Sequence, residues 1–414
     1  TKKLRFVATG GKEVTHVVGR HSNANPEGYG PDAIRCVSVN GASGTVLEGF
    51  TLRDGASSKS GSVTTRQYHQ GGAMVVTDSA KDVYLVDCTI SNCVALCGGG
   101  VRGGTLIRCW IDNCNGTARG SAFDGSYAFS CLITRCYYYY TAGTAGSGRG
   151  VVGGSDLVSC AVNCTFFGNS APYGASAICC AQSATPKVSV VDCAFVSNKT
   201  CTALKFDTGS CYVTNCLFSG NYASDKTYSP ALGLAKCKSV YGCSFIGEVG
   251  PRAVFSGCDL VERCVVSNCT RTLANECLVE GGAGKVFRNC LFVKNGNSAS
   301  GNTDGRLVSQ AILLNCTVAD CDWGGGTLWS VVGKSSMCTN TIFSGNKPYD
   351  IIADRYNEWS PKMCNCLWTK QSGTVPEAKA INCKKAVDPM FTAPGDYTLQ
   401  RKSPAAGRTL NFCR

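Results

Sequence analysis

The sequence has few charged residues and almost no histidine. Asp, Glu, Lys and Arg make up 16% of the 414 residues, and the three histidines, His16, His21 and His69, all precede residue 70. No cysteine is followed by another three positions later, so the CxxC pairs of ordinary zinc sites are missing. We therefore expect neither a metal site nor a cofactor.

Helical and membrane signals are also missing. No extended i, i+3, i+4, i+7 series of apolar residues occurs, which argues against amphipathic helices. No run of about 18 apolar residues occurs either, so the sequence predicts no membrane-spanning helix. The net charge is +12, but Lys and Arg form no tight cluster, and nucleic acid is not an expected partner.

What the sequence does contain is a short motif that recurs along the chain. The hexapeptide CLFSGN (216–221) has relatives such as CAFVSN (193–198), and a sister form ends in cysteine, as in CVVSNC (264–269). Copies begin 21 to 38 residues apart, at residues 50, 88, 109, 131, 164, 193, 216, 243, 264, 290, 316, 341 and 366. The mean spacing of about 26 residues is typical of a repeat protein.

Each repeat predicts three short strands. The third hexapeptide position is usually Ile, Val or Phe, which suits a packed strand. A second apolar block follows, such as GGAMVV (71–76), and a third precedes the next hexapeptide, such as VSVVD (188–192). Three strands per repeat predict an all-β fold, a single right-handed parallel β-helix (solenoid) of roughly 13–14 coils. A sandwich or propeller would need regularly spaced tight hairpins, which do not occur.

The repeat also predicts the domain organisation. We interpret residues 1–346 as one β-helix domain, and residues 347–414 as a terminal coil with an extended tail that packs on the solenoid. No amphipathic helix covers the start of the first coil, and unpaired strand edges at an open end are a template for association. Homo-oligomers formed end to end or by lateral stacking are therefore expected.

The motifs resemble a known group of proteins. The FxxN tetrapeptides at 166–169, 195–198, 218–221, 292–295 and 343–346, with the GGA block at 71–73, resemble the repeats of chlamydial polymorphic outer membrane proteins. The closing DPMFTAPGDYTLQRKSPA (388–405) resembles the end of related bacterial β-helix surface proteins. The resemblance covers nearly the whole chain and implies a secreted or cell-surface β-helix, an adhesin or a structural protein.

Thirty cysteines occur in the chain, and many open or close a hexapeptide. They therefore fall at equivalent positions of successive coils, about 4.8 Å apart with parallel Cα–Cβ bonds, whereas a disulfide needs Cβ atoms about 3.5–4.5 Å apart. We predict that most are reduced thiols that fill the core as small hydrophobic groups. Cysteines near loops remain candidates for pairing: Cys179, Cys180, Cys364, Cys383 and Cys413.

Asparagine ends five of the hexapeptides, at Asn169, Asn198, Asn221, Asn295 and Asn346. An amide at an inward-facing turn can bond to backbone groups of its own coil and stack on the amide of the next coil. We predict a structural ladder of asparagines.

Catalysis on polysaccharides is a further hypothesis, because many parallel β-helix proteins are polysaccharide lyases or hydrolases. Hexapeptide positions two and four should face outward, and Asp112 is the only carboxylate and Arg53 the only basic residue at the fourth position. A glycosidase needs two carboxylates at the scissile bond. The candidates are Asp304, in NTDG (302–305), and the D-x-D pair Asp320 and Asp322, but no adjacent Asp pair or GHG motif accompanies them. We favour no catalytic residue.

Aromatic residues provide the candidate ligand-binding site. The residues are the consecutive Tyr137, Tyr138, Tyr139 and Tyr140, and Trp323 and Trp329 on either side of a GGG. Aromatic faces in basic surroundings suit sugars or an acidic glycan. The alternative is that the tyrosines pack under their own loop.

Two hypotheses about function remain open. The favoured one is a non-enzymatic, extracellular or cell-surface β-helix of bacterial type, structural or adhesive, whose partner is a glycan or an acidic surface polymer. The other is a polysaccharide-active enzyme, a lyase or glycoside hydrolase. The excess of basic residues fits an acidic polymer in either case.

Overall fold

The computed structural model describes residues 3–58, 70–77, 82–138, 150–154, 160–180, 188–206, 211–223, 234–251, 253–272, 277–280, 284–297, 306–322, 330–332, 336–347, 349–352, 362–372 and 380–406. These residues form strands, turns and bends, and none of them is helical. The chain divides into two compact units. The N-terminal unit holds Thr1–Tyr212 and Asn221–Tyr228, and the C-terminal unit holds Val213–Gly220 and Ser229–Arg414. The division falls within β25 (Cys211–Thr214).

In each unit the strands build three main parallel sheets, here called A, B and C, and every coil passes through them in turn. In the N-terminal unit, sheet A consists of β1 (Arg5–Val7), β4 (Val46–Glu48), β7 (Tyr84–Val86), β11 (Thr105–Ile107), β15 (Tyr127–Phe129), β19 (Cys160–Val162) and β22 (Val188–Val191). Sheet B consists of β2 (His16–Val18), β5 (Thr51–Arg53), β8 (Thr89–Ser91), β12 (Trp110–Asp112), β16 (Leu132–Thr134), β20 (Thr165–Phe167) and β23 (Ala194–Val196).

Sheet C of the N-terminal unit is less regular. It consists of β3 (Val37–Val39), β6 (Met74–Val76), β10 (Val101–Arg102), β14 (Phe123–Asp124), β18 (Gly150–Gly154), β21 (Ser170–Cys180) and β24 (Lys199–Phe206). Three further strands pair beside this path: β9 (Val94–Cys97), β13 (Asn115–Arg119) and β17 (Tyr137–Tyr138). Between β13 and β9 the register shifts after Gly116.

The C-terminal unit repeats this plan. Sheet A consists of β28 (Ser239–Tyr241), β32 (Leu260–Glu262), β36 (Val286–Arg288), β40 (Ile312–Leu314), β43 (Met337–Thr339), β46 (Lys362–Cys364) and β49 (Ala380–Ile381). Sheet B consists of β26 (Leu217–Ser219), β29 (Ser244–Ile246), β33 (Val265–Ser267), β37 (Leu291–Val293), β41 (Thr317–Ala319), β44 (Ile342–Ser344), β47 (Leu367–Trp368) and β50 (Lys384–Lys385).

Sheet C of the C-terminal unit consists of β27 (Leu234–Ala235), β31 (Phe255–Ser256), β35 (Cys277–Glu280), β39 (Arg306–Ser309) and β42 (Ser330–Val332). Smaller parallel sheets join β30 (Val249–Gly250), β34 (Thr270–Arg271) and β38 (Gly296–Asn297), and also β45 (Ile351–Ile352) with β48 (Gln371–Ser372). The one described antiparallel strand pair is β51 (Phe391–Ala393) with β52 (Asp396–Leu399).

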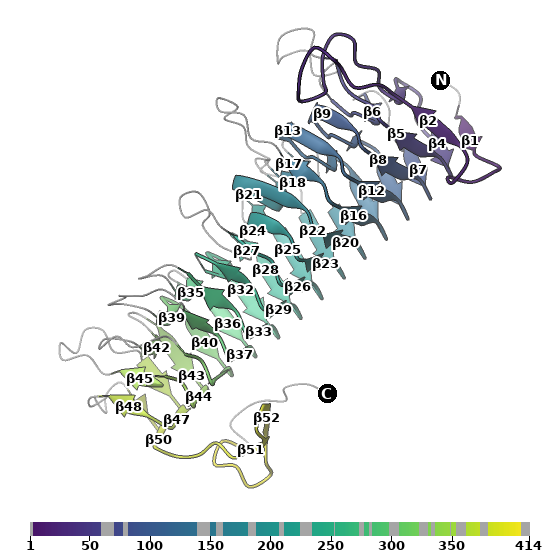
Figure 1. Cartoon of the computed structure of the whole chain (residues 1–414). Helices are drawn as coiled ribbons and strands as arrows, with labels where there is room; N and C mark the ends of the chain where they lie inside the picture. Colours follow the sequence, from purple (N-terminus) through teal and green to yellow (C-terminus); the bar gives the residue numbers. More distant parts are fainter. Residues whose placement is uncertain are drawn as a thin grey trace. The chain divides into compact units, whose positions relative to one another are not determined.

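The predicted parallel β-helix is confirmed. In Figure 1 the strands of each unit lie as successive parallel arrows, each coil beside the next. The strand types of sheets A and B recur 15 times along the described chain, slightly more often than the 13–14 coils expected. The difference arises because β1 to β3 and the short strands β49 and β50 form coils that no clear hexapeptide marks.

The interior of sheet B is a ladder of fully buried apolar side chains. Each hexapeptide contributes its third residue, because alternate residues of a strand face opposite sides of the sheet. Phe166 and Phe195 stack with ring centroids 4.7 Å apart, and Phe218 and Phe245 stack at 4.5 Å. These distances match the spacing of about 4.8 Å between strands, so identical residues stack ring on ring.

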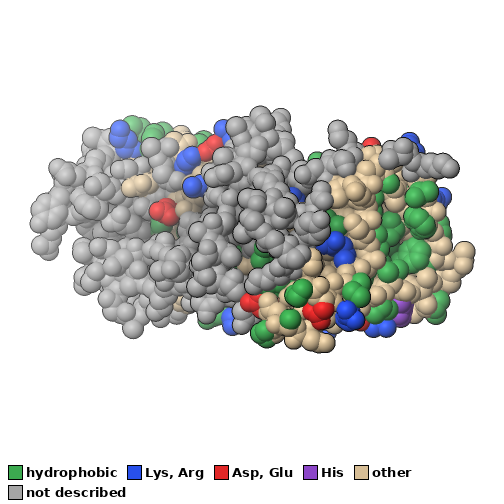
Figure 2. Space-filling view, turned by 90° about the horizontal axis from the view of Figure 1, so that it is seen from above, with side chains coloured by type: hydrophobic (Ala, Val, Ile, Leu, Met, Phe, Trp, Pro, Cys, Tyr) green, Lys and Arg blue, Asp and Glu red, His purple; other side chains and the backbone are tan. Residues whose placement is uncertain are grey.

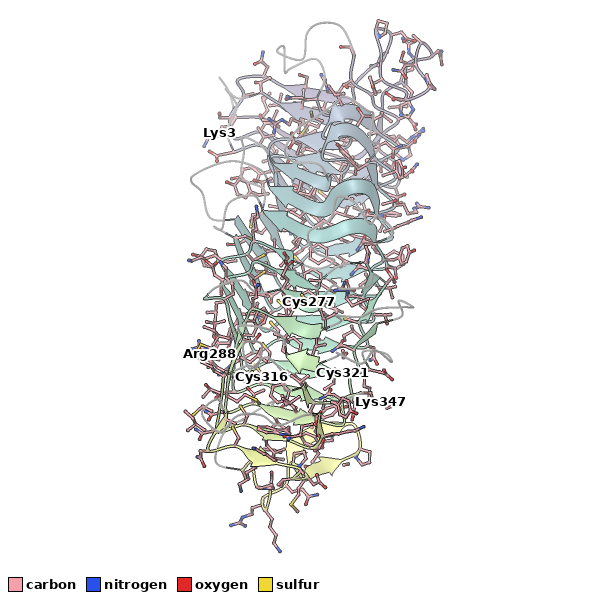
Figure 3. The ribbon with its side chains drawn as sticks, turned by 90° about the vertical axis from the view of Figure 1, so that its left-hand side faces the viewer. Lys3, Cys277, Arg288, Cys316, Cys321 and Lys347 are labelled. Carbon is pink, nitrogen blue, oxygen red and sulfur yellow. The ribbon has the colours of Figure 1, made fainter. Side chains whose placement is uncertain are left out.

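The opening cysteines form a second ladder, at the turn between sheets A and B. The Cys109 thiol, for example, donates to the carbonyls of Leu85 and Ile107, at 3.4 and 3.5 Å. Every cysteine whose side chain the structure describes is a reduced thiol, as predicted for most of them, and Cys364 and Cys383, which were candidates for pairing, form no disulfide. The side chains of Cys179 and Cys180, and the whole of Cys413, lie outside the described residues. Figure 3 labels Cys316 and Cys321, which flank β41.

The predicted asparagine ladder is confirmed as well. The Asn169 amide nitrogen donates to the side-chain oxygen of Asn198 at 3.0 Å, and Asn198 donates in the same way to Asn221 at 3.0 Å. Asn198 also donates to the Phe166 carbonyl at 2.9 Å. In the C-terminal unit, Asn346 donates to the buried carboxylate of Asp350 at 2.7 Å. Each amide thus satisfies backbone groups that no strand pairing can reach.

The C-terminal segment covers part of the outer face of sheet B. Ala405 forms a buried cluster with Ile342 and Leu367, and Val387, Phe391 and Leu399 pack against this cluster.

In the first coil an apolar side chain is exposed instead. Phe6 on β1 is 50% exposed, although its register partner Leu47 on the next coil is buried. Figure 2 shows hydrophobic side chains gathered at the right-hand end of the view, where the first strands lie in Figure 1.

A buried ion pair crosses two strands of sheet C in the N-terminal unit. Arg102 on β10 and Asp124 on β14 are register partners, and Nη1 lies 3.2 Å from the carboxylate. Their side chains are only 4% and 0% exposed. Arg102 also donates from Nε to the Gln70 side chain at 3.1 Å. Sequence reasoning missed this pair, although GGGVRGG (98–104) and GSAFDGS (120–126) align and carry opposite charges at one position.

Candidate functional site

The carboxylates proposed from sequence take part in structural contacts. Asp320 lies in the left-handed turn after β41, with a φ of 52°, and accepts a hydrogen bond from the Tyr397 hydroxyl at 2.7 Å. Asp322 lies 3.8 Å from the Lys347 ammonium, which Figure 3 labels beside Cys321. Asp304 lies outside the described residues. Both described carboxylates thus have partners from neighbouring segments.

The aromatic candidates are only partly described. Tyr138 on β17 is fully buried and Tyr137 is half-buried. Tyr139, Tyr140, Trp323 and Trp329 lie outside the described residues. Because its side chain is inside the core, Tyr138 is not available to a ligand.

An aromatic and apolar surface does occur on the outer face of sheet B in the N-terminal unit. Trp110 and Leu132 are each 39% exposed, and Phe167 on the next strand is 49% exposed. Trp110 and Leu132 are register partners on β12 and β16. Phe167 is the register partner of Thr134, so the three apolar side chains share the outer face of sheet B, with Phe167 offset by two residues from Trp110 and Leu132. We call Trp110, Leu132 and Phe167 the platform.

A polar network borders the platform. The Trp110 indole nitrogen donates to Thr134 Oγ1 at 2.8 Å, and Thr134 donates to Asp112 Oδ1 at 2.7 Å. Arg135 Nε donates to the same oxygen at 2.8 Å, and its Nη2 donates to Asp112 Oδ2. The network arises because β12 and β16 pair in register, which places Asp112 beside Thr134 and next to Arg135.

The network holds a guanidinium at the surface. The Arg135 side chain is 66% exposed, whereas that of Asp112 is 10% exposed. The hydrogen bond and charge of Asp112 raise the pKa of Arg135 above its already high ordinary value. Since a guanidinium has five N–H donors, and Nε and Nη2 serve Asp112, Nη1 is placed to donate to a ligand.

This arrangement does not resemble an acid–base pair. Both oxygens of Asp112 accept hydrogen bonds from Arg135, so the carboxylate is committed to the ion pair. The next described carboxylate along this face, Asp54, accepts from Asn92 at 2.7 Å and lies 2.6 Å from Arg53. Glycoside hydrolysis requires one carboxylic acid and one carboxylate that are free to react. The carboxylates of Asp112 and Asp54 are both held in ion pairs and hydrogen bonds, so neither is free to react.

Sequence reasoning identified Asp112 as an outward-facing residue but missed the site. The available signal was the alignment of WIDNC (110–114) with LITRC (132–136), which places Arg135 one coil from Asp112. Within the described residues, no group of three or more His, Cys, Asp and Glu side chains is arranged to hold a metal ion. In the same part of the chain, no helix long and apolar enough to cross a membrane is found.

Comparisons with known proteins give a structural likeness alone. No family model matches the chain, and no curated protein matches it in sequence. Similar solved structures include the catalytic domain of a GH87 α-1,3-glucanase in complex with nigerose, at 10% identity and a TM-score of 0.30, covering 80% of this chain and 67% of that one. PfbA, a surface adhesin of Streptococcus pneumoniae, matches at 10% identity and a TM-score of 0.28, covering 78% and 88%.

Tailspike protein 3 of bacteriophage CBA120 also matches, at 10% identity and a TM-score of 0.25. The match covers 90% of this chain and 52% of the tailspike, so the chain corresponds to about half of that protein.

Proposed function

We propose that this protein is a non-enzymatic, extracellular or cell-surface β-helix that binds glycans at the platform of Trp110, Leu132 and Phe167. The observation that carries the proposal is the Trp110–Thr134–Asp112–Arg135 network, which fixes an exposed indole ring beside a guanidinium. An aromatic face suits the apolar side of a sugar ring, and a positioned N–H donor suits its hydroxyl or carboxylate groups.

The sequence motifs support the same proposal. The FxxN and GGA repeats resemble those of chlamydial polymorphic outer membrane proteins, a group of surface β-helices. The net charge of +12 favours an acidic glycan over a neutral one through long-range attraction. Because the structure fixes the indole by a hydrogen bond, little side-chain entropy is lost on binding.

Replacing Trp110 with alanine is expected to weaken glycan binding about tenfold or more, which corresponds to about 1.4 kcal/mol of binding free energy. A glycan array with the full chain would identify the ligand, and calorimetry would compare the variants. The matched control is Tyr127→Ala, because Tyr127 is 42% exposed on the outer face of sheet A. Equal binding by Trp110→Ala and the original protein would refute the platform as the site.

The same full-length protein also tests the alternative hypothesis, that the chain is a polysaccharide-active enzyme. Incubation with acidic polysaccharides is expected to leave them intact, with no unsaturated products and no new reducing ends. If turnover appears and is lost in Asp112→Asn, the site is catalytic and the proposed function is wrong.

A further inference from the structure

The stacked thiols recur with a fixed spacing in the C-terminal unit. The register of sheet B makes each opening cysteine the neighbour of the next one along the unit. The run consists of Cys216, Cys243, Cys264, Cys290 and Cys316, and after Thr341 it resumes with Cys366 and Cys383. Neighbouring coils are in direct contact here, because the Cys216 backbone amide donates to the Cys243 sulfur at 3.4 Å.

This spacing is wrong for a disulfide but suits another link. A disulfide holds its sulfurs about 2.05 Å apart, whereas adjacent coils are about 4.8 Å apart. A cation with metal–sulfur bonds of about 2.3 Å holds two sulfurs of a linear S–metal–S unit about 4.6 Å apart. Two stacked thiolates therefore match a linear two-coordinate cation with little movement of the backbone.

We propose that neighbouring thiols of this ladder bind soft, thiophilic cations in linear two-coordinate sites, and that Cys366 and Cys383 form the accessible one. Thiolate ligands select soft cations. Two ligands suffice for linear coordination, so the lack of larger ligand clusters among the described residues does not bear on such a site.

The pair Cys366 and Cys383 has the required position. Leu367 and Lys384, which follow the two cysteines, are register partners, and the Lys384 amide donates to the Cys366 carbonyl at 2.8 Å. The Cys366 thiol donates to the Cys364 carbonyl and the Cys383 thiol donates to the Ile381 carbonyl, each at 3.3 Å, so the two side chains have equivalent positions on their coils. Cys366 is fully buried while Cys383 is partly exposed, which gives a cation a route to the pair from solvent.

The surroundings of this pair are apolar and contain further sulfur atoms. On its other side Cys366 neighbours Thr341, which has no sulfur. The buried Cys338 and Met363 are register partners in the adjoining part of sheet A, and the Cys366 thiol donates to the Cys338 carbonyl at 3.4 Å.

The binding reaction balances without an oxidant or reductant. With mercury(II), the reaction is Hg²⁺ + 2 R–SH → R–S–Hg–S–R + 2 H⁺, in which two S–H bonds are lost and two S–Hg bonds form. Metal binding to thiols releases these protons into solvent. The S–Hg–S group carries no net charge, so burying part of it in the core costs little electrostatic free energy.

The test is a titration of the reduced, full-length chain with Hg²⁺ in the presence of a small monothiol, which displaces mercury held by a single sulfur. X-ray absorption is expected to show two sulfurs at about 2.3 Å from each retained ion, and two protons should be released per ion. Cys383→Ala is expected to retain one ion fewer per chain. Its thermal unfolding, measured without metal, checks that the variant folds.

The matched control is Cys321→Ala. Cys321 is a buried thiol whose ladder neighbours are Asn295 and Asn346, so it has no stacked sulfur partner. This variant is expected to retain as many ions as the original chain. The proposal is overturned if Cys383→Ala retains the same number, if the retained ions show one or three sulfurs, or if mild oxidation links Cys366 to Cys383 as a disulfide.

Discussion

Replacing Asp124 with alanine is expected to lower the free energy of unfolding by about 3–5 kcal/mol. The substitution leaves the Arg102 guanidinium, 4% exposed, without its opposite charge in the core of the N-terminal unit. The remaining contacts of Arg102, to the Gln70 side chain and the residue 124 carbonyl, carry no negative charge. Urea denaturation followed by circular dichroism measures the loss.

Two control variants distinguish the effect of breaking a buried ion pair from the effect of breaking an exposed one. Glu48→Ala removes the Arg5–Glu48 pair, whose side chains are 67% and 29% exposed, and is expected to cost about 0–1 kcal/mol. The double variant Arg102→Met with Asp124→Leu is expected to recover most of the lost stability, because it removes both buried charges. If Asp124→Ala costs no more than Glu48→Ala, the buried pair does not exist as described.

Replacing Asn198 with alanine is expected to lower the free energy of unfolding by at least about 2 kcal/mol. The Asn198 side chain accepts hydrogen bonds from the backbone and side-chain nitrogens of Asn169 at 3.0 Å, and donates to the Phe166 carbonyl and to Asn221. Alanine leaves several of these buried groups without partners, and each such group is costly. Denaturation in urea again measures the change.

Asn198→Cys is the matched variant. Cysteine occupies the same hexapeptide position at Cys114, where its thiol donates to the carbonyls of Ile90 and Asp112 at 3.8 and 3.5 Å. The cysteine variant should therefore lose less stability than alanine, since it can donate to the Phe166 carbonyl. Equal losses for the two variants would contradict the expected hydrogen bond from the thiol to the Phe166 carbonyl.

The sequence predicts the coil well because its motif is local. Positions one, three and six of the hexapeptide face inward, and burial of Cys216, Phe218 and Asn221 follows from that alternation and the turns at its ends. The blocks GGAMVV (71–76) and VSVVD (188–192) contain β6 and β22, as expected. These features need only a strand period and a repeat.

Contacts between coils are harder to predict, because they depend on how far each intervening loop shifts the alignment. Thr317 and Ala319 sit at outward positions yet are fully buried. Hydrophobic residues of the C-terminal segment pack beside them at Ile342 and Leu367, and no periodicity reveals where that segment docks. The same limit applies to Arg102 with Asp124, which become neighbours only once two Gly-rich blocks are placed in register.

At the candidate site, too, the directions of single side chains are predictable from the hexapeptide, whereas contacts between coils are not. The outward direction of Trp110 and Asp112 follows from their hexapeptide positions. The role of Arg135 does not, because it lies in the left-handed turn after β16, with a φ of 51°, and reaches Asp112 on the preceding coil. The sequence candidates were chosen instead as consecutive aromatics or as D-x-D spacing, which are patterns along the chain and not across coils.

Alkylation of native protein under reducing conditions, mapped by mass spectrometry, tests most directly whether the hexapeptides stack with their cysteines turned inward. The expected result is slow modification of Cys193, Cys243, Cys264 and Cys290, which are all buried, and rapid modification of the partly exposed Cys383. After denaturation without reductant, all five should react as free thiols. Rapid native modification of the four ladder cysteines, or disulfide-linked peptides that contain them, would contradict the stacked β-helix described above.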